Sequence, residues 1–164
     1  IEEQNLCEIA EFACKYPVHV RFIEMMPIGY GSSFTGMSQE KIVSLLEERF
    51  GRLVPYEGEP LGNGPCKYYI VKGFQGKIGF ISAISHKFCS ECNRIRLTSQ
   101  GYLKTCLQYT AGRDLREVLR NGGTDEELKE IIKEALSEKP DGHHFREKAK
   151  EDDTESLCMA QIGG

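Results

Sequence analysis

The feature that most restricts how this sequence can fold is a set of three cysteines in one short stretch. Cys89 and Cys92 are separated by two residues, and Cys106 follows residues 94–105, which are typical of a β-hairpin turning at Ser99-Gln100-Gly101. Because a hairpin brings its two ends together, we expect Cys106 to return to the Cys89–Cys92 loop. This arrangement predicts three thiolates directed at one soft metal centre.

The spacing of the cysteines fits two kinds of metal centre. A structural zinc site takes four protein ligands, and His86, three residues before Cys89, is a candidate for the fourth. A four-iron cluster binds one cysteine per iron, so three cysteines leave one iron open to a substrate atom. The spacing does not choose between these centres, and thiols with a purely structural or redox role remain a third interpretation.

Two arginines, Arg94 and Arg96, follow Cys92 directly. In an extended strand, residues two apart lie on the same face, so both guanidinium groups are expected beside the metal centre. Guanidinium groups suit a phosphate or the acceptor edge of a purine, and a purely structural zinc site would not explain them. The alternative is that the two arginines pair with Glu24 or Glu91.

Charge and hydropathy exclude two classes of partner. The 164 residues carry 21 Lys and Arg against 25 Asp and Glu, a net charge of −4, whereas a general nucleic-acid-binding protein needs a basic face. No apolar run approaches the ~20 residues of a membrane-spanning helix. A secretory signal is also missing, so we expect a cytoplasmic protein without nucleic-acid or membrane partners, and metal binding is a better explanation of its seven cysteines than a disulfide framework. Most of the four cysteines outside the motif are expected to be small buried apolar residues.

Hydrophobic periodicity and turn residues predict an α+β fold. Helices are expected at residues 2–14, 38–50, 114–120 and 124–137, and strands at 18–24, 68–71 and 78–81 and, within the hairpin, at 94–98 and 102–105. Ser38 is expected to cap the second helix and Gly51 to end it, while Thr124 and Glu127 form a capping box for the last. Residues 27–36 and 55–65 are expected to be loops, and the polar residues 141–156 a mobile tail.

The cysteine stretch resembles a known family. The sequence FCSECNRIRLTSQGYLKTCL, residues 88–107, is similar to the second-cluster motif of the GTP 3′,8-cyclases, radical S-adenosylmethionine enzymes of molybdenum cofactor biosynthesis. RFIEMMP at 21–27 resembles the family's last barrel strand, DEEL at 125–128 opens a helix where the family has one, and the closing Gly163-Gly164 matches its double-glycine tail.

The resemblance implies a fold and a domain order. The chain would be the end of an incomplete α/β (TIM-like) barrel, followed by a C-terminal extension with short antiparallel strands and helices. Residues 1–26 would be the last helix–strand unit of the barrel, 27–140 the second-cluster and GTP-binding region, and 141–164 a flexible tail. Because the chain begins at Ile1 and lacks a C-x3-C-x2-C motif, we expect a fragment that is inactive without its N-terminal half.

The resemblance also implies an activity and its residues. The whole enzyme, a lyase, converts GTP to 3′,8-cyclo-7,8-dihydro-GTP, using S-adenosylmethionine and Fe4S4 clusters. The resemblance implies that Cys89, Cys92 and Cys106 bind an Fe4S4 cluster with one open iron. It implies that Arg94, Ile95 and Arg96 bind GTP. It also implies that Met26 contacts S-adenosylmethionine and that Gly163 and Gly164 enter the active site. The expected partners are GTP and the N-terminal half, and a homodimer is left open. The zinc-binding interaction module with His86 remains the alternative.

Overall fold

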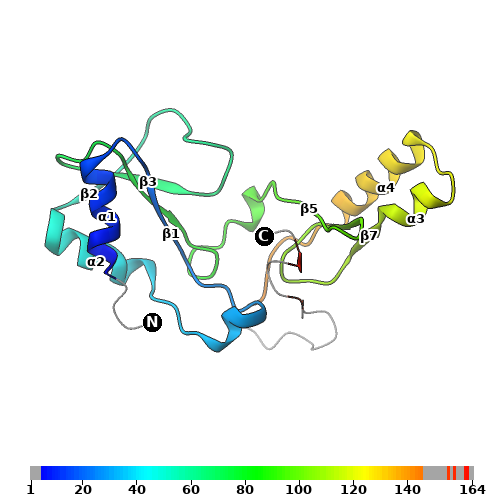
Figure 1. Ribbon diagram of the computed structural model, residues 1–164, viewed down its shortest axis with the longest axis horizontal. Helices are drawn as coiled ribbons and strands as arrows, with labels where there is room; N and C mark the ends of the chain where they lie inside the picture. Colours follow the sequence, from blue (N-terminus) through cyan, green and yellow to red (C-terminus); the bar gives the residue numbers. More distant parts are fainter. Residues whose placement is uncertain (1–4, 146–154, 156, 158–160, 163–164) are drawn as a thin grey trace. The chain divides into compact units, whose positions relative to one another are not determined.

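The computed structural model describes residues 5–145, 155, 157, 161 and 162 of the chain. The chain forms two compact units (Figure 1). The first unit combines residues 1–26 with 34–91, and the second combines residues 27–33 with 92–164. The residues predicted as one region at 27–140 are therefore shared between the two units.

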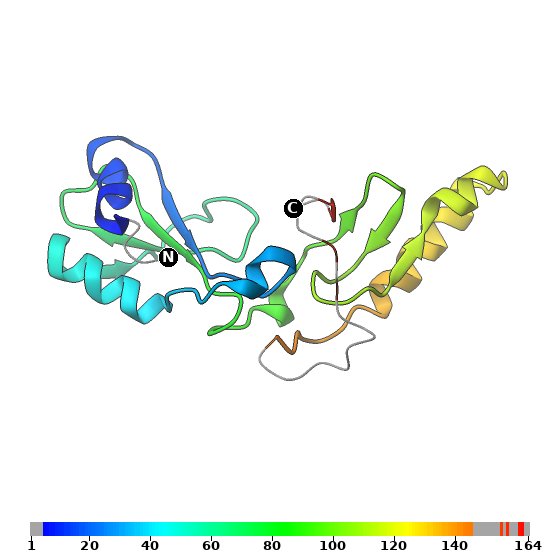
Figure 2. The same ribbon diagram turned by 60° about the horizontal axis from the view of Figure 1, so that its bottom comes forward.

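The first unit consists of two helices and a four-stranded mixed sheet (Figure 2). The helices are α1 (Leu6–Lys15) and α2 (Gln39–Phe50). The sheet has the strand order β1 (Val20–Ile23), β4 (Ile78–Ile81), β3 (Lys67–Val71) and β2 (Leu53–Pro55). Strand β1 runs parallel to β4, whereas the β4–β3 and β3–β2 pairs are antiparallel.

The ends of α2 confirm the predicted capping residues. The Ser38 side chain accepts a hydrogen bond from the Lys41 amide, which satisfies one of the free N–H groups of the first turn. At the other end Gly51 adopts φ +85°, a conformation that side-chain-bearing residues rarely adopt. The helix therefore begins and ends where these two residues require it.

The core of the first unit lies between the two helices and the sheet. Ala10 and Ala13 of α1 are completely buried, and Leu46 of α2 is buried beside them. These side chains pack against buried apolar side chains of the sheet, namely Phe22, Leu53, Val71, Ile78 and Phe80. Burial of each large aliphatic side chain stabilises the fold by roughly 1.5–3 kcal/mol, so this interface holds β1 and β4 in place.

The second unit joins a three-stranded antiparallel sheet to two helices. The strands are β5 (Arg96–Leu97), β6 (Tyr102–Lys104) and β7 (Gly112–Asp114), in that order. Helix α3 (Leu115–Arg120) follows β7, and α4 (Asp125–Ser137) begins with the predicted Thr124–Glu127 capping box. Leu103, Leu115 and Ala135 form its buried core.

Several elements differ from the sequence predictions. Strands β2 and β7 were not predicted, and the predicted loop 27–36 contains a short 3-10 helix, η1 (Gly29–Ser33). Strand β5 covers only Arg96–Leu97 of the predicted 94–98. Within the predicted tail, Glu155 and Ile162 are buried.

Both units mix helices with sheet, and the assignment of residues 1–26 to the end of a barrel stays a prediction. Among the described residues, every helix is too short or too polar to span a bilayer.

Candidate functional site

The first two cysteines of the motif lie on a short irregular loop after β4. Cys89 begins the 3-10 helix η2 (Cys89–Glu91), which is closed by a 3.1 Å hydrogen bond from the Glu91 amide to the Phe88 carbonyl. Cys92 follows η2 directly, and Cys106 comes two residues after β6. All three are half-buried free thiols. Each sulfur is thus chemically available to a soft metal.

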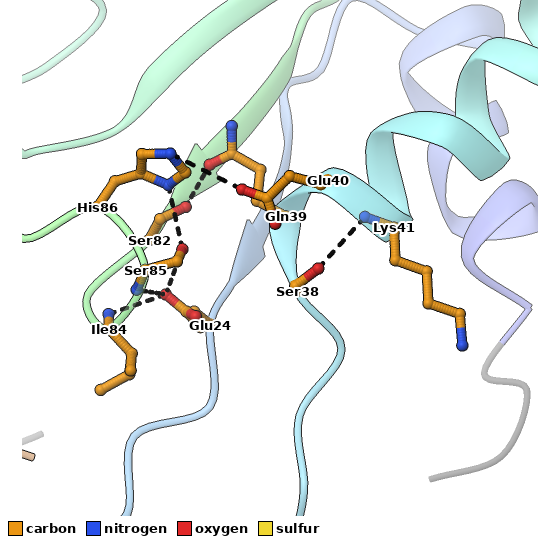
Figure 3. Close-up of polar contacts among 9 residues, drawn as sticks. All are labelled: Glu24, Ser38, Gln39, Glu40, Lys41, Ser82, Ile84, Ser85 and His86. Atoms are coloured by element: carbon orange, nitrogen blue, oxygen red, sulfur yellow. Dashed lines mark hydrogen bonds and ion pairs between the residues drawn. The ribbon is translucent and has the colours of Figure 1, made fainter. Parts of the chain in front are cut away.

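A carboxylate fixes the turn that leads into this loop. Oε2 of Glu24 accepts hydrogen bonds from the amides of Ile84 (2.8 Å) and Ser85 (2.9 Å) and from the Ser85 hydroxyl (3.1 Å; Figure 3). Glu24 reaches this turn because its own amide continues the β1–β4 pairing with a 2.9 Å bond to the Ile81 carbonyl. Glu24 therefore holds the end of β1 with its backbone amide and the start of the cysteine loop with its carboxylate.

The His86 ring is occupied by groups other than the cysteines. Its Nδ1 lies 3.1 Å from the Ser85 hydroxyl, and its Nε2 lies 3.7 Å from a carboxylate oxygen of Glu40 (Figure 3). In the same close-up, the Ser82 hydroxyl contacts the Gln39 side chain. These contacts give no support to His86 as a fourth metal ligand.

Lys139 contacts the segment 92–94 at three points. Its ammonium donates to the carbonyls of Cys92 (2.7 Å) and Arg94 (2.9 Å) and lies 3.6 Å from the Cys92 sulfur. The Arg94 carbonyl is therefore bound by a side chain rather than by a neighbouring strand. This explains why β5 begins only at Arg96, and it removes the basis for placing Arg94 and Arg96 on one strand face.

The predicted hairpin is confirmed by its hydrogen bonds. Arg96 pairs with Lys104 and Leu97 with Leu103, and the turn is closed by bonds between the Thr98 and Tyr102 backbones (3.0 Å) and between Gly101 and Thr98 (2.9 Å). Gly101 has φ +83°, which this tight turn requires. If the register is carried on by two residues, Cys106 falls opposite Arg94, close in sequence to Cys92.

The remaining predicted site residues differ in exposure, and those that the structure describes take part in no ion pair that it shows. Arg94 and Ile95 are exposed, and Arg96 and Met26 are half-buried. Within the described residues neither arginine pairs with a carboxylate, so the alternative pairing with Glu24 or Glu91 is not observed. Gly163 and Gly164 lie outside the described residues.

The three cysteines do not form a ready-made metal site. In the part of the chain that the structure describes, no three His, Cys, Asp or Glu side chains are grouped so that they could hold a metal ion. Cys89 belongs to the first unit, while Cys92 and Cys106 belong to the second. The ligand set therefore stays a prediction from the motif.

Comparison with known proteins decides the family. Residues 18–145, most of the chain, match the family Molybdenum Cofactor Synthesis C. The chain belongs to this family. It is also 45% identical to a GTP 3′,8-cyclase of Clostridium perfringens over 99% of this chain and 49% of that protein. GTP 3′,8-cyclases of Syntrophomonas wolfei and Heliobacterium modesticaldum are each 40% identical, over 99% and 100% of this chain.

The family assignment confirms the resemblance drawn from residues 88–107. This member of the Molybdenum Cofactor Synthesis C family spans about half the length of the curated relatives it matches. Sequence reasoning missed Lys139 and did not give Glu24 its observed role. The only signal for Lys139 was its place just after a predicted helix and before Pro140, where lysines often bind free carbonyls.

Proposed function

We propose that this chain is the second-cluster and substrate-binding part of a GTP 3′,8-cyclase that acts in molybdenum cofactor synthesis. The observation that carries the proposal is the 45% identity to a GTP 3′,8-cyclase over 99% of the chain, a span that contains residues 89–106 of this sequence. Because the chain spans about half of these relatives, the complete activity requires the remaining half of the protein. The product would be 3′,8-cyclo-7,8-dihydro-GTP, as the resemblance implies.

The cysteines fit an iron–sulfur cluster in their chemistry. Cys89, Cys92 and Cys106 are free thiols, and thiolates are the ligands that these clusters take. The hairpin register favours a common centre, since it carries Cys106 back toward the residues that follow Cys92. When bound through three cysteines, an Fe4S4 cluster supplies one open iron that acts as a Lewis acid toward a substrate atom.

Arg94, Ile95 and Arg96 would hold GTP beside the cluster. The exposed guanidinium of Arg94 is not engaged by any described carboxylate, and guanidinium groups bind phosphates and purine acceptor edges. Ordered contacts of this kind orient a substrate, which is the main requirement for selective attack on one ribose position. Met26 would contact S-adenosylmethionine, and Gly163 and Gly164 would enter the active site.

The ligand assignment is tested by substitution of single cysteines. The chain is loaded anaerobically with iron and sulfide, and bound iron, sulfide and visible absorbance are measured for the wild type, Cys106→Ala and Cys14→Ala. Cys14 is also a half-buried free thiol, but it lies on α1, so it controls for the loss of any thiol. We expect Cys106→Ala to lose the cluster while Cys14→Ala retains it. Equal iron in the two variants would contradict the proposal.

The substrate assignment is tested in the full-length protein that carries this chain. Arg94→Ala with Arg96→Ala should weaken GTP binding at least about tenfold, because hydrogen bonds to charged groups contribute ~1.5–3 kcal/mol each and 1.4 kcal/mol is tenfold. Arg120→Ala, in the last turn of α3, provides a control with the same chemistry on an exposed surface. A double variant that binds GTP as tightly as this control would remove the arginines from the site.

A further inference from the structure

We propose that Lys139 is a positioning residue for the cysteine ligand loop, and that its ammonium tunes the metal centre held by Cys92. The inference rests on the proposed function, because it assumes that Cys92 binds a metal. It adds a residue outside the cysteine and arginine motif. The contacts of the Lys139 ammonium with Cys92 and Arg94 join residues of the second unit only, so these contacts do not depend on how the two units are placed.

The contacts of Lys139 use every donor of its side chain. A lysine ammonium has three N–H donors and no acceptor. Here they meet three groups on one loop: the carbonyls of Cys92 and Arg94, at 2.7 and 2.9 Å, and the Cys92 sulfur at 3.6 Å. The two carbonyls bracket Asn93, so one side chain fixes the backbone between a predicted ligand and a predicted substrate-binding residue.

The main chain of Lys139 is itself held firmly. Its amide donates to the Leu136 carbonyl at 3.2 Å, in the turn that ends α4, and Pro140 follows. Helix α4 is anchored in the core of the second unit through Ala135. Beside Lys139, Glu138 forms an ion pair of 2.5 Å with Arg113 of β7. The ammonium is therefore presented to the loop from a supported position.

Two effects on a bound metal follow from this geometry. Tethering the Cys92 backbone restricts the positions of its sulfur, which preorganises the ligand and slows loss of the metal. A positive charge near a ligating sulfur favours the more reduced, more negative state of an iron–sulfur cluster, and so raises its reduction potential. The first effect depends on the hydrogen bonds and the second on the charge.

The test compares three variants of the iron- and sulfide-loaded chain. Lys139→Met removes the charge and the donors but keeps the length of the side chain, whereas Lys139→Arg keeps a cation with donors. Lys133→Met is the matched control, because it removes an exposed lysine of α4, whose ammonium pairs with the Glu130 carboxylate at 2.6 Å. Far-UV circular dichroism, reduction potential and the rate of iron loss to a chelator are measured for each.

We expect Lys139→Met to keep its helical signal, to lose iron several-fold faster than Lys133→Met, and to show a lower reduction potential. A tenfold change in the reduction equilibrium corresponds to ~59 mV for one electron. Lys139→Arg should recover at least part of both changes. If Lys139→Met loads no iron or fails to fold, recovery of loading and potential in Lys139→Arg still supports the role of the cation.

The inference is overturned if Lys139→Met and Lys133→Met share the same potential and the same rate of iron loss, or if Lys139→Arg behaves no better than Lys139→Met. A wild-type chain that takes up no iron would remove the proposed function and this inference together. A loaded wild type with unaltered Lys139 variants would remove only the inference. The two failures are therefore distinguishable.

Discussion

Lys104 and Glu155 form an ion pair in the interior of the second unit, although they are 51 residues apart in the sequence. Their side chains are only 3% and 4% exposed. The Lys104 ammonium also donates a 2.7 Å hydrogen bond to the Tyr109 carbonyl, and the Glu155 amide donates to the Gln108 carbonyl at 2.7 Å. Through these contacts Glu155 is tied to β6 and to the segment that follows Cys106.

Removing one partner of this buried pair should strongly destabilise the chain. We expect Lys104→Met or Glu155→Gln alone to lower the free energy of unfolding by ~3–5 kcal/mol, because an isolated charge or an unpaired polar group would remain buried. The double variant Lys104→Met with Glu155→Leu should recover most of the loss. Urea unfolding followed by circular dichroism measures these changes.

The exposed pair Lys133–Glu130 provides the control for this prediction, since surface ion pairs contribute only ~0–1 kcal/mol. If Lys104→Met is no more destabilising than Lys133→Met, the buried pair does not stabilise the fold as described.

Gly76 should not tolerate a side chain. A Cβ atom at this position would lie 1.7 Å from the Val18 carbonyl oxygen, and the Gly76 amide donates to the Ala13 carbonyl at 2.8 Å. Because both neighbours are backbone, Gly76→Ala requires main-chain movement, and we expect a loss of ~1–3 kcal/mol or more in thermal or urea unfolding. Gly142→Ala, where a Cβ would meet nothing within 4 Å, should be close to neutral. Equal stability of the two variants would refute the close approach.

The capping box of α4 should contribute measurably to stability. The Thr124 hydroxyl accepts from the Glu127 amide at 3.2 Å, and the Glu127 carboxylate accepts from the Thr124 amide at 2.7 Å. Thr124→Ala should lower the free energy of unfolding by ~1 kcal/mol, whereas Thr124→Ser keeps the hydroxyl and should have little effect. Chemical denaturation of both variants checks this, and indistinguishable midpoints would show that the hydroxyl does not matter.

His19 should make the stability of the first unit depend on pH. Burial lowers the pKa of the His19 ring from its ordinary 6.5, and the nearby charges of Lys77 and Arg21 lower it further. The ring also accepts a 3.2 Å hydrogen bond from the Lys77 amide at Nδ1, which only the neutral form can do. As the pH falls, His19 of the unfolded chain therefore takes up a proton at a higher pH than His19 of the folded chain.

The contribution of the neutral His19 ring to the free energy of unfolding is therefore fully present above pH 6.5. It decreases as the pH falls toward the lower pKa that His19 has in the folded state. Unfolding free energies of the wild type and His19→Gln, measured from neutral to mildly acidic pH, should converge as the pH falls. A constant difference between the two proteins would show that His19 does not titrate in this way.

Local signals predicted the elements that local chemistry determines. Ser38 and Gly51 located both ends of α2, and Thr124 located the start of α4, because capping residues act within one turn. Strand β7 was missed because Gly112, Arg113 and Asp114 have little strand preference, and its pairing with β6 creates it. Strand β2 was hidden by Pro55, which a strand at the edge of a sheet tolerates.

The sequence indicated candidate site residues only where their side chains form a recognisable motif. The three cysteines and two arginines of residues 89–106 form a motif that is recognisable in the sequence alone. Lys139 binds mainly backbone carbonyls, which every residue possesses, so nothing at Cys92 or Arg94 indicates its partner. Because this contact with the Arg94 carbonyl leaves no signal in the sequence, Arg94 was predicted as part of a strand.

The double use of Glu24 has a mechanical consequence. Its carboxylate meets the Ile84 and Ser85 amides only while β1 keeps its present register against β4. A slip of β1 by one residue would displace it by ~3.3 Å, more than a hydrogen bond tolerates, and would turn its side chains to the opposite face. A force that shears this edge strand would thus break the contacts of Glu24 with the turn at 83–86. The segment that leads from this turn to Cys89 would then lose its anchor on β1.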